Sequence, residues 1–284
     1  METQPSDDGA SPAEYPSWVL LDQESAQYED HNDVDANTLA VAITSSGHLI
    51  RFSFQFRATP AISRIRLHHL GAPDEVGFDF QTISAHRDSV LVKVHTMPVP
   101  ATPATPIYSA GTSRKPSLFL LPPCYIRLRQ EEEQTRHERI ERYMDYRSTA
   151  ILCRGNDTPM VANLDVSANQ LDGELCLFRS DEWELKPPLP VHHDKEKAEE
   201  LSYWEETDMV VAVGDRFLYW VNLFRGIIFT DVSEKDPVLR YISLPLKPLL
   251  RRRSYEYVEG PETDRRVCVT GGDTVFSDFY SILV

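Results

Sequence analysis

Two pairs of adjacent histidines are the first residues in this sequence that invite a metal-binding interpretation. They are His68-His69 and His192-His193. Neighbouring residues on a β-strand point to opposite faces of the sheet, so neither pair can easily bind one metal ion from a strand. Both pairs are therefore interpreted as ordinary core or surface histidines.

Four cysteines could bind a metal or take part in redox chemistry, but their spacing argues against a zinc site. Cys124, Cys153, Cys176 and Cys268 stand alone in the sequence, and no two of them form the CxxC pair of a zinc knuckle. The last three lie in apolar, strand-like runs, where a cysteine behaves as a small buried hydrophobic residue. This use of cysteine is typical of a reducing compartment.

The patterns that mark common catalytic and nucleotide-binding sites are absent. The sequence has no GxSxG nucleophile elbow, no GxGxxG loop and no Walker loop. The Gly271-Gly272-Asp273 run is interpreted as a hairpin turn, and the runs Glu131 to Glu133 and Glu205-Glu206 as solvated carboxylates rather than an acid–base pair. The sequence therefore predicts no catalytic, cofactor-binding or metal-ligating residue, and no cofactor.

The charge balance limits the kinds of partner. The formal net charge is −15, with 29 Lys and Arg residues against 44 Asp and Glu residues. A protein that binds nucleic-acid phosphates usually clusters its basic residues, whereas here the one short cluster is Arg251 to Arg253, interpreted as a solvated turn. The acidic balance also disfavours anionic membranes. We therefore expect a protein partner rather than nucleic acid or membrane.

The N-terminus and the hydropathy pattern predict a soluble protein of the cytoplasm or nucleus. The first residues are acidic and poor in apolar side chains, without the pattern of a secretory signal. No apolar run approaches the roughly 20 residues of a membrane-spanning helix.

The stretch from Asp208 to Leu246 gives the clearest structural signal. It contains short apolar runs separated by turn residues, among them Gly214-Asp215, a two-residue hairpin connection. This pattern predicts an antiparallel meander, the building unit of a β-propeller or a β-sandwich. The predicted strands are Met209 to Val213, Arg216 to Asn222, Ile227 to Val232 and Val238 to Ser243.

Similar meanders are predicted earlier in the chain. Residues 48–56 alternate between apolar and polar, the period of a half-buried strand. Gly173 and Gly226 each open a strand–turn–strand unit that ends in Leu-Pro, at a spacing near the roughly 50 residues of a kelch-type blade. The other strands are expected at 18–22, 39–44, 62–70, 78–85, 90–95, 117–121, 150–154, 160–166, 174–179, 183–185 and 267–270, with a final apolar run through Val275 and Phe276.

The domain prediction is a disordered N-terminus at 1–15, followed by a single β-propeller-like domain at 16–284. Residues 97–116 are rich in proline, which cannot hold a sheet ladder, so they are expected to form a loop. Residues 129–146 are expected to form a peripheral helical insert, with glutamates near its N-terminus and an apolar stripe of few residues. A second, short helix is considered at 197–201.

Several segments of the chain resemble a known family. The specific part is GDRFLYWVNLFRGIIFTDV at Gly214 to Val232, with LRYISLPL at Leu239 to Leu246. Together with PSWVLLD at Pro16 to Asp22, SLFLLPP at Ser117 to Pro123 and RRVCVTGGDTVF at Arg265 to Phe276, it resembles a plant family expanded in grasses, the domain of unknown function 1618 (DUF1618).

The resemblance implies a fold but no chemistry. Members of the family look like propeller-type β proteins, similar in style to the kelch-like domains attached to plant F-box proteins. The family has no established activity, cofactor or catalytic residue, so no functional residue is carried over. Asn222 stands where the family more often has Asp, and similar proteins continue with further strands after the Gly271-Gly272 turn, so a truncated C-terminus is expected here.

We call Gly214 to Leu246, the specific part of the resemblance, the family block. Four of its residues are interpreted as structural. Trp220 is expected in the core, Gly226 at a turn that needs positive φ, and Asp231 as a turn former at a strand end, with Arg225 beside them.

The sequence therefore predicts a mainly β protein, an irregular or truncated propeller with one peripheral helix, which acts as a non-enzymatic protein-interaction module. Two alternatives stay open. One is a propeller-type hydrolase with a central carboxylate site, and the other is a degenerate product without function.

Overall fold

The computed structural model describes the chain in blocks. They are residues 16, 18–22, 26–27, 36–44, 47, 49–69, 77–97, 107–111, 117–125, 140–155, 159–166, 171–245, 265–270 and 273–278. These residues form a mainly β protein of antiparallel meanders, which confirms the predicted fold class. The predicted disordered segment 1–15 and the Gly271-Gly272 turn lie outside the described residues.

The first sheet follows the period of two that its sequence predicts. Its strand order is β1-β5-β4-β3, with β2 pairing β5. On β4, Ile50, Phe52 and Phe54 are buried in one apolar cluster with alternate residues of β5. The strands are β1 (Leu20–Leu21), β2 (Ala26–Gln27), β3 (Ala40–Ile43), β4 (Leu49–Gln55) and β5 (Ile62–His69).

The second sheet is a regular four-stranded meander that corrects one prediction. It comprises β6 (Gly77–His86), β7 (Ser89–Met97), β8 (Ile107–Gly111) and β9 (Ser117–Leu120), paired in that order. The segment 97–116 was expected to be a loop throughout, yet β8 lies within it and pairs with both β7 and β9. The physical reason is that no proline falls between Ile107 and Gly111, so every backbone N–H of β8 is available to the ladder.

The third meander comprises β10 (Thr149–Leu152), β11 (Met160–Val166), β12 (Asp172–Arg179) and β13 (Glu182–Leu185). The strand β14 (Leu189–His192), which the sequence analysis did not predict, pairs antiparallel with β12 and parallel with β18. It contains Pro190, and this proline weakened the strand signal in the sequence. The strand can still form because it pairs with β12 and with β18 over only two residues each.

The fourth meander confirms the prediction for residues 208–246 nearly residue by residue. It comprises β15 (Met209–Val213), β16 (Phe217–Asn222), β17 (Gly226–Asp231) and β18 (Leu239–Ser243), joined as successive antiparallel neighbours. A final hairpin, β19 (Arg265–Thr270) and β20 (Asp273–Asp278), follows, with β19 beside β15.

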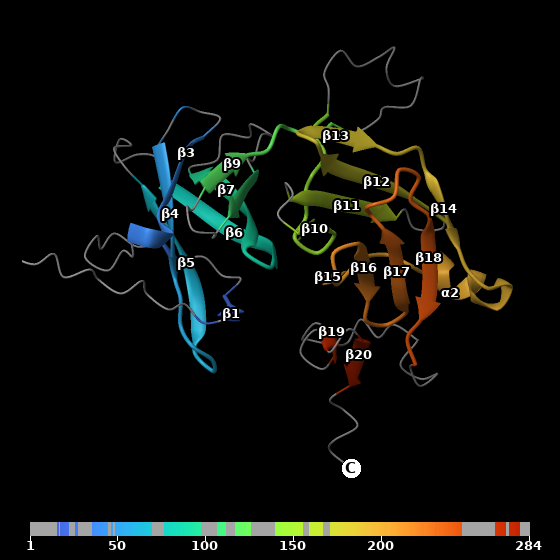
Figure 1. The fold of residues 1–284 in the computed structure, drawn as a ribbon. Coiled ribbons are helices and arrows are strands. Elements are labelled where there is room, and N and C mark those ends of the chain that lie inside the picture. Colours follow the sequence, from blue (N-terminus) through green and yellow to red (C-terminus); the bar gives the residue numbers. More distant parts are fainter. Residues whose placement is uncertain are drawn as a thin grey trace, which may run out of the picture.

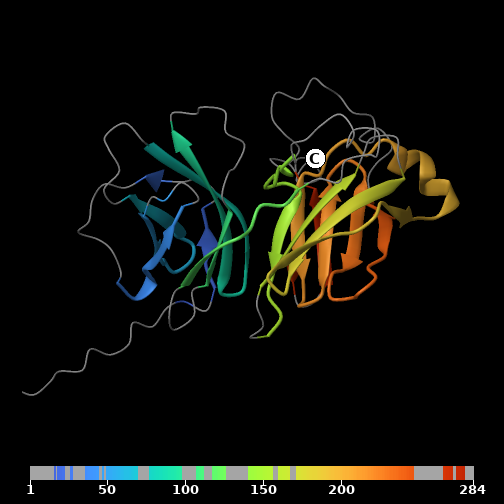
Figure 2. The same ribbon diagram turned by 90° about the horizontal axis from the view of Figure 1, so that it is seen from above.

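The meanders pack face to face in series, with an apolar cluster between each neighbouring pair. Clusters lie between the first and second sheets, between β6–β7 and β10–β12, between β10–β12 and β15–β18, and between β15–β17 and β19. Figure 1 shows this succession from blue to red, and Figure 2 shows the blue-to-green sheets beside the yellow-to-orange sheets. The strands β6, β10, β15 and β19 are successive neighbours, so the arrangement is propeller-like.

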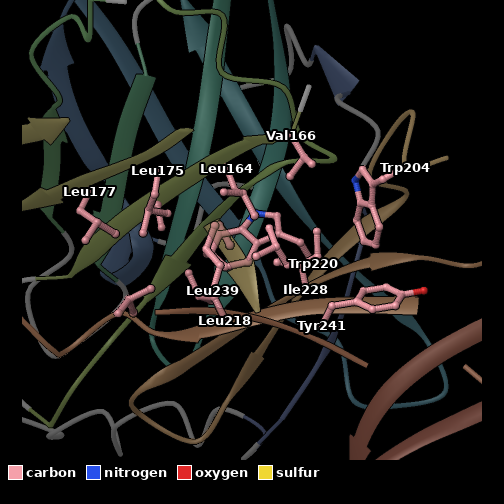
Figure 3. Packing of buried hydrophobic residues seen from close by; sticks show 14 of the residues in the cluster. Leu164, Val166, Leu175, Leu177, Trp204, Leu218, Trp220, Ile228, Leu239 and Tyr241 are labelled. Carbon is pink, nitrogen blue, oxygen red and sulfur yellow. The ribbon is translucent and has the colours of Figure 1, made fainter. Parts of the chain in front are cut away.

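The cluster between the third and fourth meanders is the largest. Trp220 of β16 lies at its centre, with Leu164 of β11 on one side and Ile228 and Leu239 on the other (Figure 3). Trp204, which precedes β15, packs edge-on against Tyr241 with ring centroids 6.3 Å apart. Aromatic side chains thus fill the space between the third and fourth meanders, which β14 joins into one nine-stranded sheet.

In the described part of the chain the helices are short. They are η2 (Ala36–Thr38), η3 (Lys195–Lys197) and α2 (Ala198–Ser202), and the last two confirm the short helix considered at 197–201. Of the helical insert expected at 129–146, residues 126–139 lie outside the described part of the chain, and 140–146 are not helical. Instead Glu141 forms a β-bridge with Tyr125, so the end of that prediction is wrong. In the described blocks, no helix is both long and apolar enough to span a bilayer.

Candidate functional site

His68 and His193, one from each histidine pair, make hydrogen bonds within the fold. His68 is buried, and its Nε2 lies 2.8 Å from the Oγ of Ser53 on the neighbouring strand. His193 makes a hydrogen bond from its Nδ1 position to the carbonyl oxygen of Val191 at 2.7 Å. Among the residues that the structure describes, no three His, Cys, Asp or Glu side chains gather where they could hold a metal ion.

The cysteines divide into three buried thiols and one exposed thiol. Cys124, Cys153 and Cys176 are buried in the cluster between the second and third meanders. Cys268 was expected to be buried, but it is exposed, because β19 lies at the end of the series and only its Val267 side packs against β15–β17. Cys153 is joined to the second sheet, since its backbone N–H donates to Nδ1 of His86 at 2.9 Å.

Trp220 and Asp231 have the structural roles that the sequence predicts, whereas Gly226 has a different one. Trp220 is fully buried, and Asp231 accepts hydrogen bonds from the backbone N–H and hydroxyl of Ser233, as expected of a core residue and a turn former. Gly226 was expected to need positive φ, and this is wrong, because it begins β17 in extended conformation. It is glycine because a Cβ would lie 2.2 Å from the carbonyl oxygen of Ile242.

A pocket lies where three separate segments meet at the ends of the third and fourth meanders. Its volume is about 330 Å³, and its walls come from residues 142–148, 163–166 and 204–207. We call it the Arg142 pocket. The first segment leads into β10, the second ends β11, and the third leads into β15. Loops carried by rigid sheets are the usual place for a binding site in a β fold.

Arg142 holds this site together. Its side chain is 5% exposed, and its Nε donates to Oδ1 of Asn163 at 2.6 Å. Its two terminal nitrogens reach Glu174, one to the backbone carbonyl oxygen at 3.1 Å and one to the carboxylate at 3.3 Å. A buried guanidinium with this many acceptors is fixed in position rather than free to sample rotamers.

Asn163 links Arg142 to the segment before β10 by hydrogen bonds. Its amide nitrogen donates to the hydroxyls of Ser148 and Thr149, each at 3.0 Å. Since its oxygen accepts from Arg142, both ends of the amide are engaged and its orientation is set. The carbonyl oxygen of Ser148 also accepts from the indole nitrogen of Trp220 at 2.9 Å. A hydrogen bond therefore joins Ser148 in the pocket wall to Trp220 of the family block.

Tyr143, one of the residues that line the pocket, contacts a buried lysine of the second sheet. The Nζ of Lys93 lies 3.7 Å from the centroid of the Tyr143 ring, while Tyr143 itself is 73% exposed. Burial lowers the pKa of Lys93, although Asp145 and Glu141 oppose this. Burial also raises the pKa of Glu141, opposed by Lys93. Tyr143 thus has one face on a cation and presents the rest of its ring to solvent at the pocket.

The third wall is held by Asn222. Its side-chain amide donates to the carbonyl oxygen of Glu206 at 2.9 Å, and its Oδ1 accepts from the backbone N–H of Phe224 at 3.0 Å. Across the pocket, Arg147 forms an ion pair of 3.5 Å with Glu206. The segment 204–207 is therefore positioned from both sides.

The pocket carries an excess of negative charge. Four carboxylates line it, from Asp145, Asp165, Glu205 and Glu206, against the two guanidinium groups of Arg142 and Arg147. Both guanidinium groups already have carboxylate partners. The side chain of Asp165 is 70% exposed. Such a site is suited to recognising a cationic group rather than to nucleophilic chemistry.

A second, larger hollow of about 680 Å³ lies at the N-terminal end of the chain. Its walls include Trp18, Phe54, Phe56 and the β6–β7 turn at Arg87 and Asp88. The stacked rings of Phe54 and Phe56 make it largely aromatic. It has fewer converging polar groups than the Arg142 pocket, because His86 in its wall is engaged with Cys153.

Sequence reasoning did not find the Arg142 pocket. Residues 129–146 were interpreted as one amphipathic helix, which would have placed Arg142 on its surface, and Glu205-Glu206 were interpreted as solvated. The usable signal was a tryptophan beside two glutamates, Trp204 to Glu206, shortly before the strongest predicted meander.

Comparison with known proteins adds a family but no chemistry. A search of curated proteins finds no match. The plant source and kelch-like style stay predictions. Residues 220–278 match the model of the family described as Protein of unknown function (DUF1618), which confirms the resemblance found in the sequence.

Proposed function

We propose that the protein is a non-enzymatic protein-interaction module of the cytoplasm or nucleus, and that its Arg142 pocket accepts an arginine side chain of a partner protein. The observation that carries this proposal is the charge of the pocket, with four carboxylates against two guanidinium groups that are already paired. An incoming cation would be attracted by the pocket and by the net charge of −15.

Arginine fits the site better than lysine. The ring of Tyr143 is 73% exposed, and a planar guanidinium can lie flat on its open face while its edge donates parallel hydrogen bonds, a geometry that a compact ammonium group lacks. Asp145 and Asp165 line the same pocket and offer carboxylate oxygens, which a guanidinium can bind through two parallel hydrogen bonds. Tyrosine and arginine are also the residue types that dominate the binding energy of protein interfaces.

The hydrolase alternative finds less support. It requires carboxylates that converge at the centre of the propeller-like arrangement. The neighbouring central strands β10 and β15 have the sequences TAIL and MVVAV, without a carboxylate in either.

The loop Leu223 to Gly226, which connects β16 to β17, is another place where a partner could be expected to bind, but it is not suitable for a test by mutation. Leu223 is fully buried, and its carbonyl oxygen accepts from Arg265 at 3.1 Å. Changes there would disturb the core, so the test belongs at the Arg142 pocket.

The test is a fluorescence-polarisation screen of the full chain against a peptide array in which each arginine peptide has a citrulline twin. We expect selective binding of arginine peptides, weakened about tenfold by Asp165→Asn, which corresponds to loss of one charge contact. Asp181→Asn, at an exposed turn with φ of 64° that asparagine tolerates, is the matched control and should leave binding unchanged. Equal binding of arginine and citrulline peptides would contradict the proposal.

A further inference from the structure

The larger hollow, of about 680 Å³, has the volume of a small-molecule binding site. We call it the Trp18 hollow. Three segments of the first two sheets form its walls, namely residues 18–21, the end of β4 at residues 54–56, and the β6–β7 turn at residues 85–90. Most of its lining residues are apolar, so it favours a ligand whose bulk is apolar too.

Three aromatic rings give the hollow flat apolar surfaces. Phe54 of β4 and Phe56, two positions later, stack with ring centroids 5.6 Å apart and ring planes 9° apart. Trp18 lies on a different wall, and it is 63% exposed. An exposed indole beside a hollow can stack on a planar ring of a ligand.

The walls are held by contacts to the sheets. Asp22, next to the wall that carries Trp18, donates its backbone N–H to the carbonyl oxygen of Ser63 at 2.9 Å, and its carboxylate pairs with Arg64 at 3.2 Å. At the base of the β6–β7 turn, Nδ1 of His86 accepts the backbone N–H of Cys153 at 2.9 Å. Because these segments are already ordered, a ligand need not order them when it binds.

Arg87 brings a positive charge to the edge of the hollow. It is the first residue of the two-residue turn between β6 and β7, since His86 and Ser89 are paired in the ladder. Its φ is 56°, a conformation that such turns usually give to glycine, asparagine or aspartate. Its guanidinium makes no ion pair or hydrogen bond with any residue that the structure describes. A long side chain in this conformation beside a hollow is better explained by binding than by turn formation.

The charges at this edge suit an anion with a single charge. Asp88 also lines the hollow and accepts from the hydroxyl of Ser89 at 3.3 Å. Burial, and then the charge of Arg87, lower the pKa of His86, so its ring is neutral at pH 7. A phosphate monoester, with about two negative charges at neutral pH, would be repelled by Asp88 and by the net charge of −15. A carboxylate brings one charge and can accept two parallel hydrogen bonds from a guanidinium.

We propose that the Trp18 hollow binds a flat aromatic molecule that carries one carboxylate. The ring system of the ligand lies against Trp18, Phe54 and Phe56, and its carboxylate pairs with Arg87 at the edge. The Trp18 hollow and the Arg142 pocket take ligands of opposite charge, so the two sites can be tested separately.

The test is isothermal titration calorimetry of the full chain with 2-naphthoate, with its neutral amide 2-naphthamide and with 2-naphthyl phosphate. We expect naphthoate to bind saturably and about tenfold more tightly than the amide, because the amide lacks the charge that strengthens the bond to Arg87. The phosphate should bind more weakly than naphthoate. The proposal is overturned by equal binding of naphthoate and the amide, by tighter binding of the phosphate, or by the lack of a saturable signal with naphthoate.

The variant Arg87→Asn removes the charge and introduces a residue that tolerates the turn conformation. It should lower the affinity for naphthoate about tenfold, to that of the amide, and leave the affinity for the amide unchanged. Arg240→Gln is the matched control, because it removes the same charge from an exposed position on β18 and should not change naphthoate binding. An unchanged affinity for naphthoate in Arg87→Asn would overturn the proposal.

The variant Trp18→Leu tests the aromatic wall at an exposed residue. It should weaken the binding of naphthoate and the amide by about fivefold each, because both ligands lose the same stacking surface. Asp165→Asn, in the Arg142 pocket, should change neither affinity. Undiminished binding of both ligands to Trp18→Leu would contradict the assignment of the hollow, and this variant decides if Arg87→Asn does not fold.

Discussion

The indole nitrogen of Trp220 donates a hydrogen bond to the carbonyl oxygen of Ser148 at 2.9 Å, across 72 positions of sequence. Trp220 opens the segment that matches DUF1618, and Ser148 lies in the wall of the Arg142 pocket. The same carbonyl oxygen accepts from the backbone N–H of Leu164 at 3.2 Å. The matched segment therefore supports the pocket without contributing a group that faces it.

Replacing that tryptophan should weaken both the core and the pocket. Trp220→Phe removes the hydrogen bond and leaves unfilled volume in the largest cluster, so we expect the free energy of unfolding to fall by about 3 kcal/mol. Urea denaturation measures it. The control is Trp183→Phe, which loses a similar bond, to the carbonyl oxygen of Pro122, at an exposed site and should cost less. Equal losses would contradict the anchoring role.

Asn222→Asp tests the hydrogen bond that holds residues 204–207. An ionised carboxylate cannot donate to the carbonyl oxygen of Glu206, so the variant should lose about 2 kcal/mol of unfolding free energy at neutral pH. Part of this loss should be recovered at acidic pH, because a protonated carboxyl can donate. Asn222→Ala, which loses both bonds without adding charge, should show no such recovery relative to the parent chain.

Gly226→Ala tests the close approach between β17 and β18. The new Cβ would lie 2.2 Å from the carbonyl oxygen of Ile242 and 2.6 Å from the Tyr241 ring, so the strands must separate. We expect a loss of about 3 kcal/mol, measured by thermal or urea unfolding. Gly214→Ala is the control, since Gly214 has φ of +63° but open space around it, and should lose only about 1 kcal/mol. A reversed order would contradict the steric explanation.

His86 should make stability depend on pH. Burial, and then the charge of Arg87, lower its pKa below the ordinary value, so the unfolded chain binds a proton more readily than the folded one. The contribution of His86 is therefore complete above the unfolded pKa of about 6.5 and is lost as pH falls through the lower folded pKa.

Urea denaturation between about pH 5 and 7 measures this effect. His86→Asn keeps an acceptor near the Nδ1 position for the N–H of Cys153 but cannot titrate, so it should flatten the slope. An unchanged slope in His86→Asn would show that another group is responsible.

Much of the fold could be predicted because strand signals are local. The alternation of Ile50, Phe52 and Phe54 and the turn at Gly214 each specify a strand or hairpin within a few residues. The strand β14 was missed because Pro190 weakens the local signal, and its pairing with β12 and β18 depends on distant chain.

The candidate site could not be predicted, because it depends on contacts between residues that are distant in the sequence. Arg142, Asn163 and Glu206 come together only after the third and fourth meanders have packed, and none of them stands in a motif. Charged residues were assigned to solvent because burial of a charge requires partners that sequence does not reveal.

The most direct test of the account is nuclear magnetic resonance of the isotopically labelled full chain, titrated with N-acetyl-arginine amide and, separately, with its citrulline analogue. The account predicts amide shift changes at residues 145–148, 165 and 205–207 with arginine alone, reduced at about 1 M salt where charge is screened. Equal shifts with citrulline, or shifts spread evenly over the surface, would contradict the assignment of the Arg142 pocket.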